Sequence, residues 1–325
     1  MTAALLDTFG RAATDMRVSL TDKCNLRCTY CMPAEGLSWL PSGELLTDDE
    51  IVRLVQVAAS LGVTTVRLTG GEPLIRPGLP GLVARLAQHV DLSLTTNGLG
   101  LTKLAQPLAD AGLRRVNVSL DTLRPDRFLA LTRRDRLNDV IDGMAAAADA
   151  GLTPVKVNTV LMRGVNDDEA AALLEWCLER GYELRFIEQM PLDPQHAWDR
   201  TAMVTADEIL EQITVEHELT PDVRGSAPAE VWLVDGGPAR VGVVGSVTRP
   251  FCGTCDRIRL TADGQLRTCL FAREESDLRS ALRAGATDAE LAVRMQAAVR
   301  GKKAGHGIDD PEFLQPQRPM SAIGG

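Results

Sequence analysis

The chain has 325 residues, of which 45% are hydrophobic, and a formal net charge of −9. This length and apolar content can bury one large core, or one large and one smaller core, and they exclude a disordered chain. We expect neither membrane insertion nor export, because no apolar run approaches a bilayer span and the first residues lack a signal-peptide pattern. The negative charge also disfavours a general nucleic-acid surface, which requires a basic face.

The first predicted strand, Met16–Thr21, leads into the cysteine triplet Cys24, Cys28 and Cys31 with the spacing C-x3-C-x2-C. Cysteine thiolates are the usual ligands of iron–sulfur clusters, and four of them complete an electron-transfer centre. A triplet without a nearby fourth cysteine therefore predicts a 4Fe-4S cluster in which one iron is open to another ligand. A zinc loop or a disulfide pair are the alternatives, but zinc usually takes four nitrogen or sulfur ligands and no histidine lies near.

Strand and helix patterns alternate over the first two-thirds of the chain. The predicted strands are Met16–Thr21, Thr65–Thr69, Asp91–Thr96, Arg115–Asp121, Pro154–Val160 and Glu183–Glu188. A helical pattern follows each strand, which predicts an α/β fold with a parallel sheet curled into an incomplete (β/α)6 barrel. Capping boxes mark two helix starts, at Thr47 with Glu50 and at Thr205 with Glu208.

One parity of these strands is apolar and the other is largely polar. Helices outside a parallel barrel cover the apolar parity, so the polar parity should face inward. The inward set is Arg17, Ser19, Thr21, Arg67, Thr69, Ser93, Thr95, Asn117, Ser119, Asp121, Lys156, Asn158 and Arg185. It predicts a polar cavity whose cations need an anionic partner. The alternative is a solvated face of an open antiparallel sheet, which the strand–helix alternation disfavours.

Near Gly225 the pattern changes to short strands, Glu230–Val234 and Val241–Thr248, and then to helices up to about Arg300. We therefore predict two domains, a partial barrel over 1–225 and a smaller α+β domain over 226–325 that closes the open side.

This second part carries the triplet Cys252, Cys255 and Cys269, which predicts a second cluster with an open iron, although C-x2-C also suits half of a zinc ribbon. Arg257 and Arg259 would share one face if their segment is extended. The remaining cysteine, Cys177, lies in the helical stretch Asp168–Arg180 and is interpreted as a core residue.

Several short motifs carry a resemblance to the radical S-adenosylmethionine (SAM) superfamily, and within it to the molybdenum cofactor biosynthesis protein A family of GTP 3′,8-cyclases. The match runs nearly end to end. The motifs are the two cysteine triplets with Tyr30, Thr69 to Pro73, Thr95 to Gly98, Asn117 to Asp121, Val155 to Val160, Arg185 to Glu188 with Met190, Cys252 to Arg259, and the terminal Gly324 and Gly325.

The resemblance implies a role for each matching residue. Cys24, Cys28 and Cys31 would hold the cluster that chelates SAM, and Cys252, Cys255 and Cys269 the cluster that meets the guanine of GTP. The implied SAM-binding residues are Tyr30, Gly71, Glu72, Ser119 and Met190. The implied GTP-binding residues are Arg17, Arg67, Thr95, Lys156, Arg257 and Arg259. The guanidinium groups of the arginines suit phosphate oxygens, and the lysine adds a compact charge. The implied catalytic residues are Arg17 and the terminal pair Gly324 and Gly325. In this family the terminal pair reaches into the active site.

The implied reaction is a radical SAM lyase reaction. An electron cleaves SAM to methionine and a 5′-deoxyadenosyl radical, which takes hydrogen from C3′ of GTP, and C3′ then bonds to C8 to give 3′,8-cyclo-7,8-dihydro-GTP. The implied partners are a reduced flavodoxin- or ferredoxin-type donor and the next enzyme of the pathway. A homodimer is left open. Reduced thiols fit a cytoplasmic location.

Two rival functions remain at this stage. One is another radical SAM enzyme, such as a peptide-modifying one, which usually has more downstream cysteines than the second triplet here. The other is an iron–sulfur or zinc regulator that binds nucleic acid, which the acidity and the lack of a basic helix disfavour.

Overall fold

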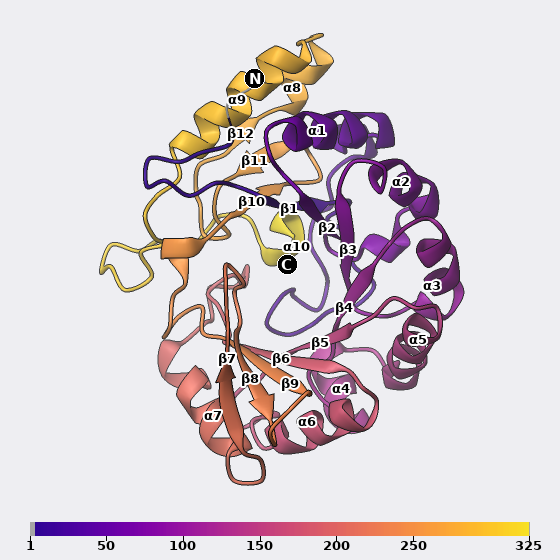
Figure 1. The fold of residues 1–325 in the computed structure, drawn as a ribbon, viewed down its shortest axis with the longest axis vertical. Coiled ribbons are helices and arrows are strands. Elements are labelled where there is room, and N and C mark those ends of the chain that lie inside the picture. The colour runs from indigo at the N-terminus through magenta and orange to yellow at the C-terminus, as the bar shows by residue number, and fades with distance from the viewer. Residues whose placement is uncertain (1–3, 325) are drawn as a thin grey trace.

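The computed structural model describes residues 4–324. Six strands pair in parallel in chain order: β1 (Asp15–Ser19), β2 (Thr65–Thr69), β3 (Asp91–Thr96), β4 (Arg115–Ser119), β5 (Val155–Val160) and β6 (Glu183–Ile187). The helices between and after them are α1 (Asp48–Ser60), α2 (Leu79–Leu86), α3 (Leu101–Asp110), α4 (Pro125–Thr132), α5 (Leu137–Asp149) and α6 (Ala170–Glu179). Figure 1 shows these helices around the outside of a curved sheet, which confirms the predicted partial barrel.

Local sequence patterns predicted most of these elements correctly. Strands β2 and β3 have the predicted bounds, whereas β1 and β4 end two residues earlier than predicted. Both predicted capping boxes form: the Glu50 N–H donates to the Thr47 hydroxyl at 3.2 Å, and Thr205 and Glu208 make the same reciprocal pair. These bonds satisfy N–H groups that the first helical turn leaves free.

The two parities of the strands separate as predicted. The apolar set, such as Val18, Val66 and Leu92, is fully buried and belongs to one core between sheet and helices. The polar set turns inward, and Arg17, Arg67, Thr95, Ser119, Asn158 and Arg185 line a central cavity.

The C-terminal part extends the same sheet at both edges. At one edge β9 (Arg240–Val244) pairs in parallel with β6 and carries β8 (Glu230–Val234) and β7 (Leu219–Asp222). At the other edge β10 (Arg257–Leu260) pairs in parallel with β1 and carries β11 (Gln265–Arg267) and β12 (Ser276–Asp277). The result is one 12-stranded sheet, and the chain from β9 to β10 crosses the open side.

This crossing places Cys252 and Cys255 of the second triplet where the barrel would otherwise be open, and Cys269 follows β11. The 3-10 helix η4 (Cys252–Thr254) lies in the crossing, while the other short helices are η1 (Ser42–Glu44), η2 (Pro73–Ile75) and η3 (Arg200–Ala202). The predicted boundary near Gly225 falls in the loop between the paired strands β7 and β8, and the division into 1–225 and 226–325 stays a prediction.

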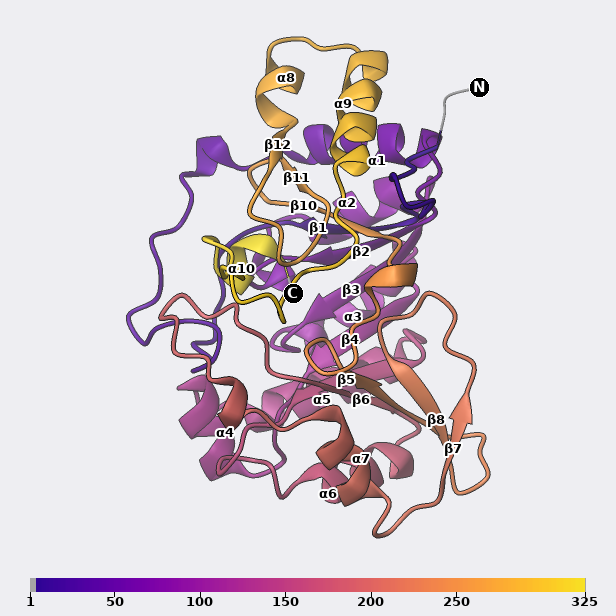
Figure 2. The ribbon, with the colours of Figure 1, turned by 90° about the vertical axis from the view of Figure 1, so that its left-hand side faces the viewer.

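The remaining helices lie near both edges of the sheet and in the middle of the barrel (Figure 1). They are α7 (Ala206–Ile213), α8 (Arg279–Arg283), α9 (Asp288–Arg300) and α10 (Met320–Ile323). Helix α9 packs against α1, and Figure 2 shows α8 and α9 at the same end of the molecule. Helix α10 lies near the middle of the barrel in Figure 1. Within residues 4–324, no helix is long and apolar enough to cross a membrane.

Candidate active site

A cavity of about 310 Å³ lies inside the barrel, and both cysteine triplets line it. Most of the residues predicted for the site come together here. Besides the six cysteines, the lining includes Tyr30, Gly71, Ser119 and Met190, and also Arg17, Arg67, Thr95, Arg257 and Arg259. Glu72, Lys156 and Gly324 are not among the lining residues, and Gly325 lies outside the described residues.

The first triplet lies in the loop after β1. The Leu26 N–H donates to the Cys24 sulfur at 3.4 Å, and the Asn97 amide nitrogen lies 3.8 Å from the same sulfur. Burial raises the pKa of Cys24 and Cys28, and raises that of Cys31 to about 12. These thiols therefore hold their protons at neutral pH until a metal displaces them.

The second triplet has a more cationic environment. Cys252 and Cys255 flank the turn at η4, and Cys269 follows β11. Burial raises the pKa of Cys255, but the positive charges of Arg257 and Lys302 outweigh this and leave the pKa below its ordinary value. The Cys255 sulfur is thus placed to carry a negative charge.

The arrangement of both triplets fits iron–sulfur clusters. Among residues 4–324, no group of three His, Cys, Asp or Glu side chains is placed to hold a single metal ion. One zinc ion would bring its thiolates within about 4.6 Å of one another, twice the Zn–S bond length. In a cube each thiolate binds a different iron, so the sulfurs stand farther apart. Two triplets made only of thiols, both lining one cavity, have the donor chemistry of such clusters.

Gly70 and Gly71 pack against the cluster loop. A Cβ on Gly70 would lie 2.4 Å from the Thr21 carbonyl oxygen, and one on Gly71 would lie 2.2 Å from that of Lys23. Gly70 also has a φ of +141°, which L side chains rarely adopt. Sequence reasoning assigned Gly71 to ligand contact and missed this close approach of two backbones.

Glu72 is fully buried behind the cavity wall. Its carboxylate accepts hydrogen bonds from the N–H of Leu74 at 2.9 Å, the hydroxyl of Thr96 at 2.7 Å and the N–H of Asn97 at 2.7 Å. Burial raises its pKa to about 7. Glu72 therefore ties the loop after β2 to the end of β3.

We expect Glu72→Ala to lower the free energy of unfolding by about 3 kcal/mol, because the buried donors that it satisfies would lose their acceptor. Denaturant unfolding of the metal-free protein measures this, and the exposed Glu175→Ala on α6 is the control. An unchanged unfolding midpoint would show that Glu72 does not hold the two loops together.

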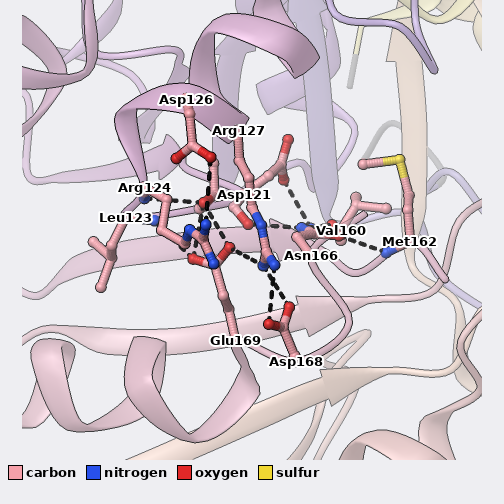
Figure 3. Close-up of polar contacts among 11 residues, drawn as sticks. Asp121, Leu123, Arg124, Asp126, Arg127, Val160, Met162, Asn166, Asp168 and Glu169 are labelled. Carbon is pink, nitrogen blue, oxygen red and sulfur yellow. Dashed lines mark hydrogen bonds and ion pairs between the residues drawn. The ribbon is translucent and has the colours of Figure 1, made fainter. Parts of the chain in front are cut away.

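Asp121 connects the cluster loop to the far side of the barrel. Its carboxylate accepts from the Tyr30 hydroxyl at 2.7 Å and from the Val160 N–H at 2.9 Å. Its carbonyl oxygen accepts from the Asn166 side-chain amide at 2.7 Å, and Asn166 accepts in turn from the N–H of Met162 (Figure 3). Because burial raises the pKa of Tyr30 well above its ordinary value, this phenol stays protonated and donates. The network fixes the ring that stands beside Cys31.

The cavity wall contains the arginines Arg17 and Arg67, whose guanidinium groups are buried and form no ion pair within residues 4–324. Burial and the neighbouring Arg67 lower the pKa of Arg17 to about 9, and burial lowers that of Arg67 to about 10. Arg17 Nε and one terminal nitrogen of Arg257 are buried without a hydrogen-bond partner in the part of the chain described. Buried donors are nearly always satisfied, so this set indicates an anionic ligand.

Lys156 and Gly324 lie outside the set of residues that line the cavity. The Lys156 ammonium forms an ion pair with Glu183, the residue opposite it on β6. Gly324 is buried inside the barrel, where its carbonyl oxygen accepts a hydrogen bond from Arg259.

Further lining residues were not assigned to the site from the sequence. They include Asn97, Asn158, Arg185, Phe251 and Ser321. Asn158 and Arg185 belong to the inward parity and Asn97 to the Thr95–Gly98 motif, so these had a usable signal. Phe251 and Ser321 had none, because no local pattern shows that the segment before η4 or helix α10 reaches the barrel centre.

Comparison with known proteins places these features in context. The radical SAM superfamily profile matches residues 18–177, and the profile described as Molybdenum Cofactor Synthesis C matches residues 182–308. A protein of Streptomyces coelicolor named GTP 3′,8-cyclase is 66% identical over 99% of this chain and 96% of its own length. A Mycobacterium marinum protein of the same name is 58% identical over 99% of this chain and 92% of its own length.

Solved structures share the fold. The crystal structure of Streptococcus suis SuiB bound to S-adenosylmethionine superposes with a TM-score of 0.60 over 90% of this chain and 69% of that one. At 14% sequence identity, the likeness concerns the fold alone.

Proposed function

This chain belongs to the GTP 3′,8-cyclase family, and on that premise we propose how its residues carry the reaction. It is a radical SAM lyase of molybdenum cofactor biosynthesis that uses two 4Fe-4S clusters and SAM, with GTP as substrate. When bound, the clusters and SAM supply a 5′-deoxyadenosyl radical that takes hydrogen from C3′ of GTP before C3′ joins C8 to give 3′,8-cyclo-7,8-dihydro-GTP. The observation that carries the assignment is one cavity lined by both triplets and by arginines, of which Arg17 and Arg257 each have a buried nitrogen without a hydrogen-bond partner within residues 4–324.

The first triplet and its surroundings form the proposed SAM side. Cys24, Cys28 and Cys31 hold the first cluster, and Tyr30, Gly71, Ser119 and Met190 line the SAM site beside it. Tyr30 is oriented by Asp121 and Gly71 by its contact with the cluster loop. Glu72 lies behind this side of the cavity and accepts three hydrogen bonds that hold the loop after β2 against the end of β3.

The second triplet and the cations form the proposed GTP side. Cys252, Cys255 and Cys269 would hold the second cluster, which would supply an open iron on the side of the cavity proposed for GTP. Arg17, Arg67, Thr95, Arg257 and Arg259 bind the triphosphate and ribose, because guanidinium groups form paired hydrogen bonds to phosphate oxygens. The protein thereby positions C3′ and excludes water from the radical.

The decisive test mixes reconstituted protein anaerobically with SAM, a reductant and each nucleotide, and measures 5′-deoxyadenosine and the cyclic nucleotide. GTP should give both products. A peptide-modifying enzyme would form no cyclic nucleotide from GTP, and a nucleic-acid-binding regulator would not cleave SAM.

Lys156 pairs with Glu183 outside the cavity lining, and we propose that its charge contributes to GTP binding. Lys156→Ala should weaken GTP binding about tenfold, or about 1.4 kcal/mol, while SAM cleavage persists. Titration calorimetry with GTP measures this. Glu183→Gln is the matched variant: it removes the ion-pair partner of Lys156 and should keep GTP affinity or strengthen it. Equal losses of SAM and GTP binding in Lys156→Ala would assign the residue to the scaffold instead.

The remaining partners follow from the chemistry. The reaction consumes an electron, for which we propose a reduced flavodoxin- or ferredoxin-type donor, and its product passes to the next enzyme of the pathway. We propose a cytoplasmic location, because the six ligand thiols must stay reduced. A homodimer stays open, and we propose neither a nucleic acid nor a membrane as a partner.

A further inference from the structure

Lys302 is a buried lysine beside the second triplet. It follows α9, and only 5% of its surface is exposed. Its ammonium nitrogen donates to the carbonyl oxygens of Cys255 at 2.8 Å and Arg257 at 2.9 Å. It also lies 3.6 Å from the Cys255 sulfur. The next residue, Lys303, is exposed, so burial is specific to this position.

The positive charge of the buried Lys302 ammonium group requires a compensating partner. A buried ammonium group is costly unless an anion compensates it. Two of its three partners are neutral carbonyl groups, so among them only the Cys255 sulfur can carry a negative charge. The thiolate form of Cys255 is the form that binds iron.

The two carbonyl contacts also fix a piece of backbone. They hold the Cys255–Arg257 segment at both ends, where the chain leaves η4 and enters β10. This segment contributes a cluster ligand at one end and a cavity-lining guanidinium at the other. The Lys302 ammonium group therefore fixes the position of Cys255 relative to Arg257.

We propose that Lys302 is a positioning residue of the second cluster: it orients the Cys255–Arg257 segment and compensates the negative charge of the bound thiolates. The inference rests on the proposed function, because it requires a cluster at the second triplet. No contact between Lys302 and substrate is involved.

The test compares Lys302→Met, Lys302→Arg and the control Lys303→Met in the full chain. The first triplet is replaced by alanine in each, so that only the second cluster contributes to the spectrum. The parent in this background should hold about four irons. Lys302→Met should release iron to a chelator about tenfold faster, as is common when an outer-shell partner of a metal ligand is lost, and its midpoint potential should become more negative. Lys302→Arg should restore both values toward the parent, and Lys303→Met should match the parent.

Each other outcome overturns the inference or the premise, and the two are distinguishable. Parent-like iron release and midpoint potential in Lys302→Met would overturn the inference. Loss of the folded state by circular dichroism in both Lys302 variants would also overturn it and make the residue part of the scaffold. A parent that holds no iron at the second triplet would instead refute the two-cluster function.

Discussion

Deleting Gly324 and Gly325 should reduce the rate of cyclic nucleotide formation by at least about two orders of magnitude, while both clusters and tight GTP binding persist. A loss of roughly 3 kcal/mol is common when catalytic groups are misplaced by a small distance. Chain ends usually tolerate such changes, so a large effect requires that the tail takes part in the site.

The surroundings of Gly324 supply the reason. Its φ is +85°, and a Cβ here would lie 2.3 Å from the Ser19 hydroxyl oxygen and 2.6 Å from that of Thr69. Its carbonyl oxygen accepts from Arg259, one of the proposed GTP-binding residues. Gly324→Ala should therefore displace the tail and act in the same direction as the deletion.

Gly307→Ala is the matched control for this prediction. Gly307 also has a left-handed φ, +70°, but the nearest atom to an added Cβ is 4.0 Å away. It would carry a comparable backbone strain without the steric conflict. Product assays by chromatography with saturating SAM and GTP measure the effect. Parent-like product formation by the truncated protein would show that the tail has no catalytic role.

The barrel could be predicted because its signals are local. Alternating polarity located β2 and β3, and the capping boxes located the starts of α1 and α7. Strand β10 was missed because it is short and its position depends on a distant partner: Asp15 lies opposite Arg257 in the parallel register. No local pattern carries such long-range information.

The sequence predicted which face of each strand lines the cavity better than it predicted which residues along that face do so. Inward parity correctly placed Arg17 and Arg67 in the cavity wall, but parity does not say how far along a strand a side chain lies. Lys156 has the same parity and pairs with Glu183 because the register of β5 and β6 sets the two side by side. Lys302 gave no signal at all, since lysine is rarely buried.

Replacing Cys24, Cys28 and Cys31 by alanine should abolish SAM cleavage, an effect of at least about three orders of magnitude, because no iron would then be available to chelate SAM. The anaerobically reconstituted parent should hold about eight irons and eight sulfides, and the variant about half of each. Iron, sulfide and 5′-deoxyadenosine are measured on the same sample.

The complementary replacement of Cys252, Cys255 and Cys269 separates the two halves of the site. It should halve the iron in the same way but leave SAM cleavage measurable, because the first triplet lies in a different loop with its own support from Asn97 and Tyr30. Cyclised product should disappear, since the guanine loses its anchor. Cys177→Ala is the control: this cysteine is buried in α6 within the apolar core, so its loss should leave the iron content unchanged. Stoichiometric zinc at the second triplet of protein purified without oxygen would contradict the two-cluster assignment.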